Sequence, residues 1–181
     1  MSVGETEKLL KANEEYAKKE FPGRQPMPPS RHVAVLACMD ARLTVSKLLG
    51  LKTGEAHIIR NAGGIATDDA IRSLIISNEL LGTREFIVIN HTDCGMLTFK
   101  DNELSERLAK KYGRAEEAAR IRFYAFSNLE DNVREQVRKI KQYPLIPKDI
   151  RVSGFIYEVE TGKLRNVVYE PQTGVAATVA S

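Results

Sequence analysis

Residues 32–38 have the sequence His-Val-Ala-Val-Leu-Ala-Cys, and residues 85–90 have the sequence Glu-Phe-Ile-Val-Ile-Asn. Both stretches are short, and both are nearly continuous runs of apolar side chains. A strand with one wet face alternates apolar and polar residues, whereas a strand covered on both faces does not. The two stretches therefore predict buried strands of a parallel sheet.

The segments around these strands alternate between helical and extended patterns. Helices are expected over 44–50, 68–81, the polar stretch 101–126, and from the capping box Ser127-x-x-Glu130 to Pro144; further strands are expected over 57–60, 151–159 and 164–169. The last two form a hairpin through Thr161-Gly162. The prediction is an α/β fold, with a mostly parallel central sheet flanked by helices and an antiparallel edge strand.

The N-terminal region has a different character. Residues 4–20 predict a helix with a narrow apolar stripe, and a proline-rich connector follows at 23–30. Such a helix can act as an arm that packs on a second subunit. We therefore divide the chain into an N-terminal helical arm (1–25), an α/β domain (26–170) and a small, polar tail (171–181) that we expect to be disordered.

Composition limits the possible partners and locations. The 181 residues carry a net charge of +3, from 27 basic and 24 acidic side chains that are interspersed, which argues against nucleic acid as a partner. The longest apolar run, Val33–Met39, is far below the roughly 20 residues of a membrane span. Residues 1–21 contain no apolar run like that of a secretory signal. We expect a cytoplasmic protein with no membrane segment.

Three potential metal ligands lie where this fold class places its sites. Cys38 ends the first predicted strand, and His91 and Cys94 directly follow the strand over 85–90. In such sheets, ligands bind beyond the carboxyl ends of the strands. Two thiolates and one imidazole suit Zn²⁺, and three protein ligands leave a fourth position for water, as in catalytic zinc sites. The sequence predicts a catalytic zinc centre.

Asp40 and Arg42 follow the first of these ligands. Arginine can hold a carboxylate through two parallel hydrogen bonds. Two arrangements stay open: Asp40 occupies the fourth zinc position, or it turns to Arg42 and lets water bind.

Simpler interpretations exist for each part of this set. His-x-x-Cys occurs often by chance, a lone cysteine is most often a buried filler, and Asp40 with Arg42 can be an ordinary turn ion pair. Two further alternatives are a non-catalytic zinc module and a thiol redox enzyme that uses both cysteines. His32 is interpreted as a residue at the start of a strand and His57 as a partly exposed residue, and neither is expected to be a metal ligand.

Three motifs together resemble the beta-class carbonic anhydrases. They are Ala37-Cys38-Met39-Asp40-Ala41-Arg42-Leu43, Arg60-Asn61-Ala62-Gly63 and His91-Thr92-Asp93-Cys94-Gly95-Met96. Their order and spacing are similar to those of the short prokaryotic branch of that family, and the resemblance extends from about Pro26 to Tyr169.

The resemblance implies a lyase that hydrates CO₂ reversibly to bicarbonate and a proton, by attack of zinc-bound hydroxide. Cys38, His91 and Cys94 would hold Zn²⁺, and Asp40 and Arg42 would be the catalytic dyad, with Asp40 as a fourth zinc ligand in some members. It also implies a homodimer or a multiple of dimers, with the N-terminal helix embracing the partner.

The chain departs from the family pattern at two places. Ala41 stands where many members have serine, and Pro28 and Pro29 stand where plant-type members carry a substrate-facing glutamine. Substrate orientation is therefore expected to rest on backbone groups around Gly63 and Gly64. Related proteins hydrolyse carbonyl sulfide or carbon disulfide at the same zinc site, and this alternative also stays open.

Overall fold

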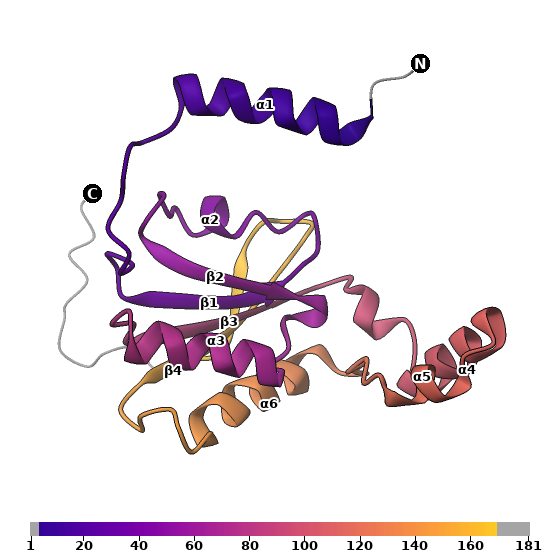
Figure 1. Cartoon of the computed structure of the whole chain (residues 1–181). Coiled ribbons are helices and arrows are strands. Elements are labelled where there is room, and N and C mark those ends of the chain that lie inside the picture. Colours follow the sequence, from indigo (N-terminus) through magenta and orange to yellow (C-terminus); the bar gives the residue numbers. More distant parts are fainter. Residues whose placement is uncertain (1–3, 170–181) are drawn as a thin grey trace.

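The computed structural model describes residues 4–169, and its centre is one five-stranded sheet in the order β2-β1-β3-β4-β5. The strands are β1 (Val33–Cys38), β2 (Ala56–Asn61), β3 (Glu85–His91), β4 (Arg151–Tyr157) and β5 (Leu164–Val168). The first four are parallel, and β5 pairs antiparallel with β4. The predicted sheet with its antiparallel edge strand is confirmed (Figure 1).

The strand order creates a crevice at one edge of this sheet. From β1 the chain passes to β2 on one side, and it later returns to form β3 on the other side of β1. In open parallel sheets, ligands bind at the carboxyl ends of the two strands where the winding direction reverses. Here those strands are β1 and β3, which end at Cys38 and His91.

Helices follow the strands much as the sequence predicted. They are α1 (Glu5–Lys19), α2 (Val45–Leu48), α3 (Asp68–Glu79), α4 (Asp101–Tyr112), α5 (Ala115–Arg120) and α6 (Leu129–Gln142), with short 3-10 turns η1 (Ala62–Gly64) and η2 (Gly95–Leu97). The hydroxyl of Thr67 accepts a hydrogen bond from the Ala70 N–H at 3.3 Å and caps α3. Helix α3 and strand β4 end slightly earlier than predicted.

Both faces of the sheet are covered, which explains the unbroken apolar strands. Ala34 and Leu36 of β1 face the layer formed by α3 and α6, whereas Val35 and Ala37 face a second cluster. Successive side chains of a strand point to opposite faces, so both sets must be apolar when both faces are buried. The second cluster includes Cys38 and Cys94 of the predicted zinc centre.

Two local predictions on the excursion between β3 and α6 are wrong. The expected helix over 101–126 is divided at Gly113, which is left-handed at φ 65°, and it ends at Arg120. It does not continue because the Asp101 carboxylate accepts N–H groups of Phe123, Tyr124 and Ala125 at 2.8–3.0 Å. Those bonds hold the segment extended, with Tyr124 in the left-handed region at φ 61°.

The capping-box prediction at Ser127 is also wrong. The residue that caps α6 is Asn128, whose side-chain oxygen accepts from the Asp131 N–H at 3.1 Å. Asparagine and serine are comparable caps, so the sequence alone did not separate the two adjacent candidates.

Helix α1 lies apart from the sheet, with none of its residues buried (Figure 1). This position agrees with the expected arm, although the domain division at residue 25 stays a prediction. The predicted tail over 171–181 lies outside the described residues. Among the described residues, no helix has the length and apolar character needed to cross a bilayer.

Candidate metal centre

The fold brings the three predicted zinc ligands together at the crevice between β1 and β3. Cys38 is the last residue of β1, His91 is the last residue of β3, and Cys94 directly precedes η2. Their ligand atoms all lie within 4.8 Å of one another. All three residues are almost fully buried, at 4%, 0% and 3% exposure respectively. The geometry is that of a preformed site for one ion.

The hydrogen bonds of His91 select the tautomer that a metal requires. Its Nδ1 lies 2.8 Å from the Thr92 carbonyl oxygen, which can only accept, so Nδ1 carries the proton. Its Nε2 is buried without any hydrogen-bond partner. A buried polar atom without a partner is costly in a folded protein. A cation on the Nε2 lone pair removes that cost, and a backbone carbonyl on the other nitrogen is the usual support of a metal-binding histidine.

The hydrogen bond between the two cysteine side chains shifts their pKa values in opposite directions. Hydrogen bonding from Cys94 contributes most to lowering the pKa of Cys38, with further lowering from His91 and from the N–H groups of Asp40 and Gly63. The same contact, together with burial, raises the pKa of Cys94. A divalent cation displaces the remaining proton, since metals bind the thiolate form. Two thiolates and an imidazole fit Zn²⁺ at three of its four usual positions.

Asp40 lies beside the centre and is held by arginine. Arg42 donates from Nε to Asp40 Oδ1 at 2.9 Å and from Nη2 to Oδ2 at 2.8 Å, and its backbone N–H also reaches Oδ1. The hydrogen bonds from Arg42 hold the pKa of Asp40 well below its usual range. Asp40 Oδ2 is also 3.8 Å from His91 Nε2. Of the two arrangements left open above, the structure shows the carboxylate turned to Arg42.

Asp93 completes the attachment of Arg42. Arg42 Nη1 donates to the Asp93 carboxylate at 2.7 Å, and Nη2 donates to its carbonyl oxygen at 2.9 Å. The backbone of Asp93 is left-handed, at φ 54°, which aspartate tolerates better than most residues. Sequence reasoning assigned no role to Asp93, although its place between His91 and Cys94 made it a natural candidate.

Arg60 is a second residue without a predicted role. Its Nε donates to the Cys38 carbonyl at 3.0 Å, and its Nη2 donates to the Asp40 carbonyl at 2.6 Å. These bonds fix the backbone that carries both residues as it leaves β1. Arg60 belongs to one of the quoted motifs, so the signal was present in the sequence, but its partners were not.

Gly63 and Gly64 lie directly beneath the centre, both with positive φ. A Cβ atom at Gly64 would come within 2.8 Å of Asn90 Nδ2 and 3.0 Å of the Cys38 backbone nitrogen, so no side chain fits there. The carbonyl of Gly63 accepts from Asn90 Nδ2 at 2.7 Å. The expected contact with substrate stays a prediction, and that carbonyl is already engaged.

His32 and His57 lie outside the centre. His57 lies on β2 and is partly exposed, as predicted, whereas His32 lies just before β1 and has a left-handed backbone at φ 54°. Nδ1 of His32 is 2.9 Å from the Gly82 carbonyl oxygen, and Nδ1 of His57 is 2.7 Å from Ser77 Oγ. Among the described residues, the only histidine grouped with cysteine or carboxylate ligands that could hold a metal is His91.

Comparisons with known proteins agree with this geometry. The sequence profile of the carbonic anhydrase family matches residues 33–164. The chain is 46% identical to beta-carbonic anhydrase 1 of Mycobacterium tuberculosis over 162 residues, which cover 90% of this chain and 97% of that protein. It is 37% identical to a carbon disulfide hydrolase of an Acidianus strain, over 86% of this chain and 85% of that protein.

A solved structure supports the same assignment. The crystal structure of carbonic anhydrase from Streptococcus mutans superposes with a TM-score of 0.87 at 44% identity, covering 92% of this chain and 99% of that one. The chain therefore belongs to the beta class of the carbonic anhydrase family and carries that family's Cys-His-Cys zinc site.

Proposed function

We propose that this chain catalyses the reversible hydration of CO₂ to bicarbonate and a proton, with Cys38, His91 and Cys94 as the zinc ligands. The observation that carries the proposal is the buried, unpartnered Nε2 of His91, which faces two cysteine sulfurs and has an arginine-held carboxylate beside it. Family membership supports the same reaction.

Zn²⁺, when bound, acidifies water and so supplies hydroxide near neutral pH. Asp40 stays ionised at neutral pH, because the hydrogen bonds from Arg42 lower its pKa. It therefore accepts a hydrogen bond from the nucleophile without removing its proton, and it orients the nucleophile's lone pair. Arg42 is anchored in turn by Asp93, so the carboxylate is held in one direction.

The surroundings of the centre suit a small apolar substrate. The cluster that contains Cys38 and Cys94 also contains Val35, Ile89 and Met96. CO₂ carries no net charge and requires no ion pair for binding. The proposed substrate contacts are the backbone groups around Gly63 and Gly64 that have no partner within the chain; the carbonyls of both glycines accept from Asn90.

Metal removal is the direct test of this function. Purified protein is expected to contain one zinc per chain and to hydrate CO₂ in a stopped-flow assay. Chelation should abolish the activity, and one equivalent of Zn²⁺ should restore it. Zinc-bearing protein with no hydration activity at any pH would indicate a non-catalytic zinc module, and active protein that is free of metal would indicate thiol chemistry.

A second substrate class deserves a parallel assay, because several relatives are carbon disulfide hydrolases at 36–40% identity. The mycobacterial carbonic anhydrase is more similar, at 46%, and we therefore favour CO₂. Rates with CO₂, carbonyl sulfide and carbon disulfide on one preparation decide between them. Faster turnover of either sulfur compound would overturn the preference.

A homodimer, or a multiple of dimers, is part of the proposal. Leu9 and Leu10 of α1 are 68% and 61% exposed in the single chain, and Tyr16 is exposed as well. An apolar stripe on a helix is normally covered. The proposed cover is the body of a second copy, with α1 acting as an exchanged arm.

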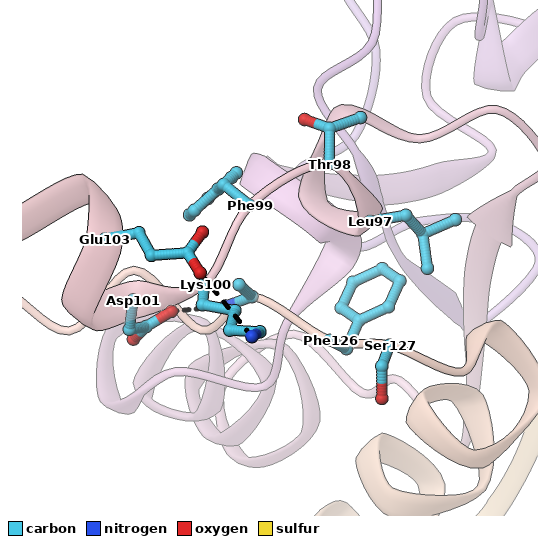
Figure 2. Close-up of a pocket in the computed structure, with 9 residues that line it drawn as sticks. Leu97, Thr98, Phe99, Lys100, Asp101, Glu103, Phe126 and Ser127 are labelled. Carbon is cyan, nitrogen blue, oxygen red and sulfur yellow. Dashed lines mark hydrogen bonds and ion pairs between the residues drawn. The ribbon is translucent and has the colours of Figure 1, made fainter.

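A cavity of about 500 Å³ lies on the excursion between β3 and α6. It runs along the segment that follows Cys94, and Figure 2 shows Leu97 and Phe126 on one side of it, with Lys100, Asp101 and Glu103 on the other. None of the zinc ligands lines it, so we do not assign it to CO₂.

The proposed location of the protein is the cytoplasm, where reducing conditions keep both thiols free.

A further inference from the structure

Three buried amide side chains connect helix α6 to the loop beneath the metal centre. They are Asn90 on β3 and Asn132 and Gln136 on α6, and their exposures are 1%, 9% and 5%. None of them belongs to a quoted motif or has a role in the reaction described above. The sequence gives little sign of them, apart from one asparagine at the end of an apolar strand.

The three amides form one chain of hydrogen bonds, which the backbone from Gly63 to Ala66 closes into a ring. Asn90 Nδ2 donates to the Gly63 carbonyl at 2.7 Å, and Asn132 Nδ2 donates to Asn90 Oδ1 at 2.7 Å. Gln136 Nε2 donates to Asn132 Oδ1 at 2.9 Å, and the Ala66 N–H donates to Gln136 Oε1 at 2.9 Å. The ring therefore begins and ends on the same loop, at Gly63 and Ala66.

Simple core packing does not require such a ring. Burying an amide is costly unless its hydrogen bonds are met, and apolar side chains of similar size would fill this space without that cost. The same face of α6 already supplies Val133, Val137 and Ile140 to the core. The ring adds a fixed position for the loop, because every amide has a defined hydrogen-bond partner and the loop is held at both ends.

The loop held by the ring contacts a zinc ligand. The backbone N–H of Gly63 lies close enough to the Cys38 sulfur to contribute to lowering the pKa of its thiol. Gly64 packs so closely that a Cβ atom there would lie 2.8 Å from Asn90 and 3.0 Å from the Cys38 backbone nitrogen. A shift of this loop would therefore disturb the backbone of Cys38 and the surroundings of a sulfur that binds the metal.

We propose that Asn90, Asn132 and Gln136 are positioning residues of the zinc centre, which hold the Gly63–Ala66 loop in its close packing against Cys38. The proposal rests on the zinc site of the proposed function, but not on the identity of the substrate. A donated N–H withdraws charge from a thiolate, so the ring sets how strongly Cys38 donates to the ion.

Gln136→Met tests this with a side chain of similar length and no hydrogen-bonding groups. Loss of such supporting contacts typically lowers metal affinity or activity about 10–100-fold. We expect the zinc dissociation constant of Gln136→Met, measured by chelator competition, to be about tenfold larger than that of the wild type. We also expect faster hydrogen exchange at Gly63 and Ala66, and a shifted sulfur-to-metal charge-transfer band in the Co²⁺-substituted protein.

Two matched controls separate positioning from general stability. Gln142→Met makes the same change on an exposed residue of the same helix, and Val137→Ala weakens the core beside Gln136 without touching the ring. Both should leave zinc affinity and the Co²⁺ spectrum unchanged. The proposal would be overturned if Gln136→Met had the same zinc affinity and the same Co²⁺ spectrum as Val137→Ala at a similar loss of unfolding free energy. The ring would then contribute to stability only.

Asn132→Leu provides an independent break in the same ring, and the double variant Asn132→Leu/Gln136→Met tests their connection. Because both substitutions open one ring, the double variant should bind zinc about as weakly as the weaker single variant. Losses that multiply would contradict a single ring. Absence of CO₂ hydration by the wild-type protein would refute the proposed function while leaving these zinc and exchange measurements valid.

Discussion

The metal centre and helix α1 differ in how much of their environment one chain supplies. The zinc ligands are almost completely buried, and each has partners within the same chain. Helix α1 has no buried residue, although it carries exposed leucines and a tyrosine. The centre is thus built by the sheet of a single chain, whereas the arm carries apolar side chains that the proposed second copy would cover. Changes in the two regions should have separable effects, on metal and chemistry in one case and on assembly in the other.

Loss of a zinc ligand should have the largest effect. Cys94→Ala removes one of two thiolates from the buried site, and we expect zinc content to fall to background and hydration to become undetectable. Metal analysis and stopped-flow assays measure both quantities. The same protein should keep the wild-type assembly state in sedimentation. Dissociation into monomers would show that the centre and the interface are not separate.

Asp40→Asn should have the next largest effect, on turnover alone. Asparagine keeps the size of the side chain but lacks the negative charge that Arg42 holds and that accepts the hydrogen bond from the nucleophile. Groups of this kind typically contribute about 10²–10⁴-fold, and we expect kcat to fall within that range with zinc retained. Zinc loss in this variant would instead identify Asp40 as a ligand. Asp69→Asn, at an exposed ion pair on α3, is the matched control.

Leu10→Ala should weaken assembly and leave the centre intact. Burial of a leucine contributes about 1.5–3 kcal/mol, which corresponds to about a tenfold or larger increase in the dimer dissociation constant. Analytical ultracentrifugation measures it, and Lys11→Ala on the same helix is the control. An unchanged assembly state would refute the role of α1 as an arm.

Asp101→Ala should have the smallest effect, on stability. Burial raises the pKa of Asp101, but the three N–H donors of the segment over 123–125 outweigh burial, and the net shift is downward. A lowered folded-state pKa means that this stabilisation is present above the ordinary pKa of aspartate, near 3.9, and is lost as pH falls through the folded value.

Loss of a cap of this type costs about 1–2 kcal/mol. Urea unfolding at pH 7 should show that difference between the wild type and Asp101→Ala, and the difference should shrink below about pH 4. A difference independent of pH would show that the carboxylate charge does not matter. Zinc content should be the same in both proteins.

The three predicted metal ligands could be found from sequence because each lies at or just after the end of a strand that its apolar run identifies. An apolar run identifies a doubly covered strand without knowledge of its neighbours, and parallel strands place their carboxyl ends at one edge. The resemblance added the reaction and the dyad. The roles of Asp40, Arg42, Gly63 and Gly64 remain predictions for the experiments above.

The errors have a common cause. The predicted helix over 101–126 fails because Asp101 binds backbone groups more than 20 residues away, and local periodicity does not report such contacts. Asn128 rather than Ser127 caps α6, because two adjacent capping residues are equivalent until packing sets the start of the helix.

By itself, the sequence determined the class of fold, the two cysteines and the histidine that could meet, and the family. Those features depend on residue type and short spacing, which a linear pattern contains. Only the tertiary structure decided that Nε2 of His91 is the bare nitrogen, that Asp93 and Arg60 hold the dyad and its strand, and that an amide ring on α6 supports the loop under Cys38. These depend on partners up to 70 residues apart, which are brought together only when both faces of the sheet are covered.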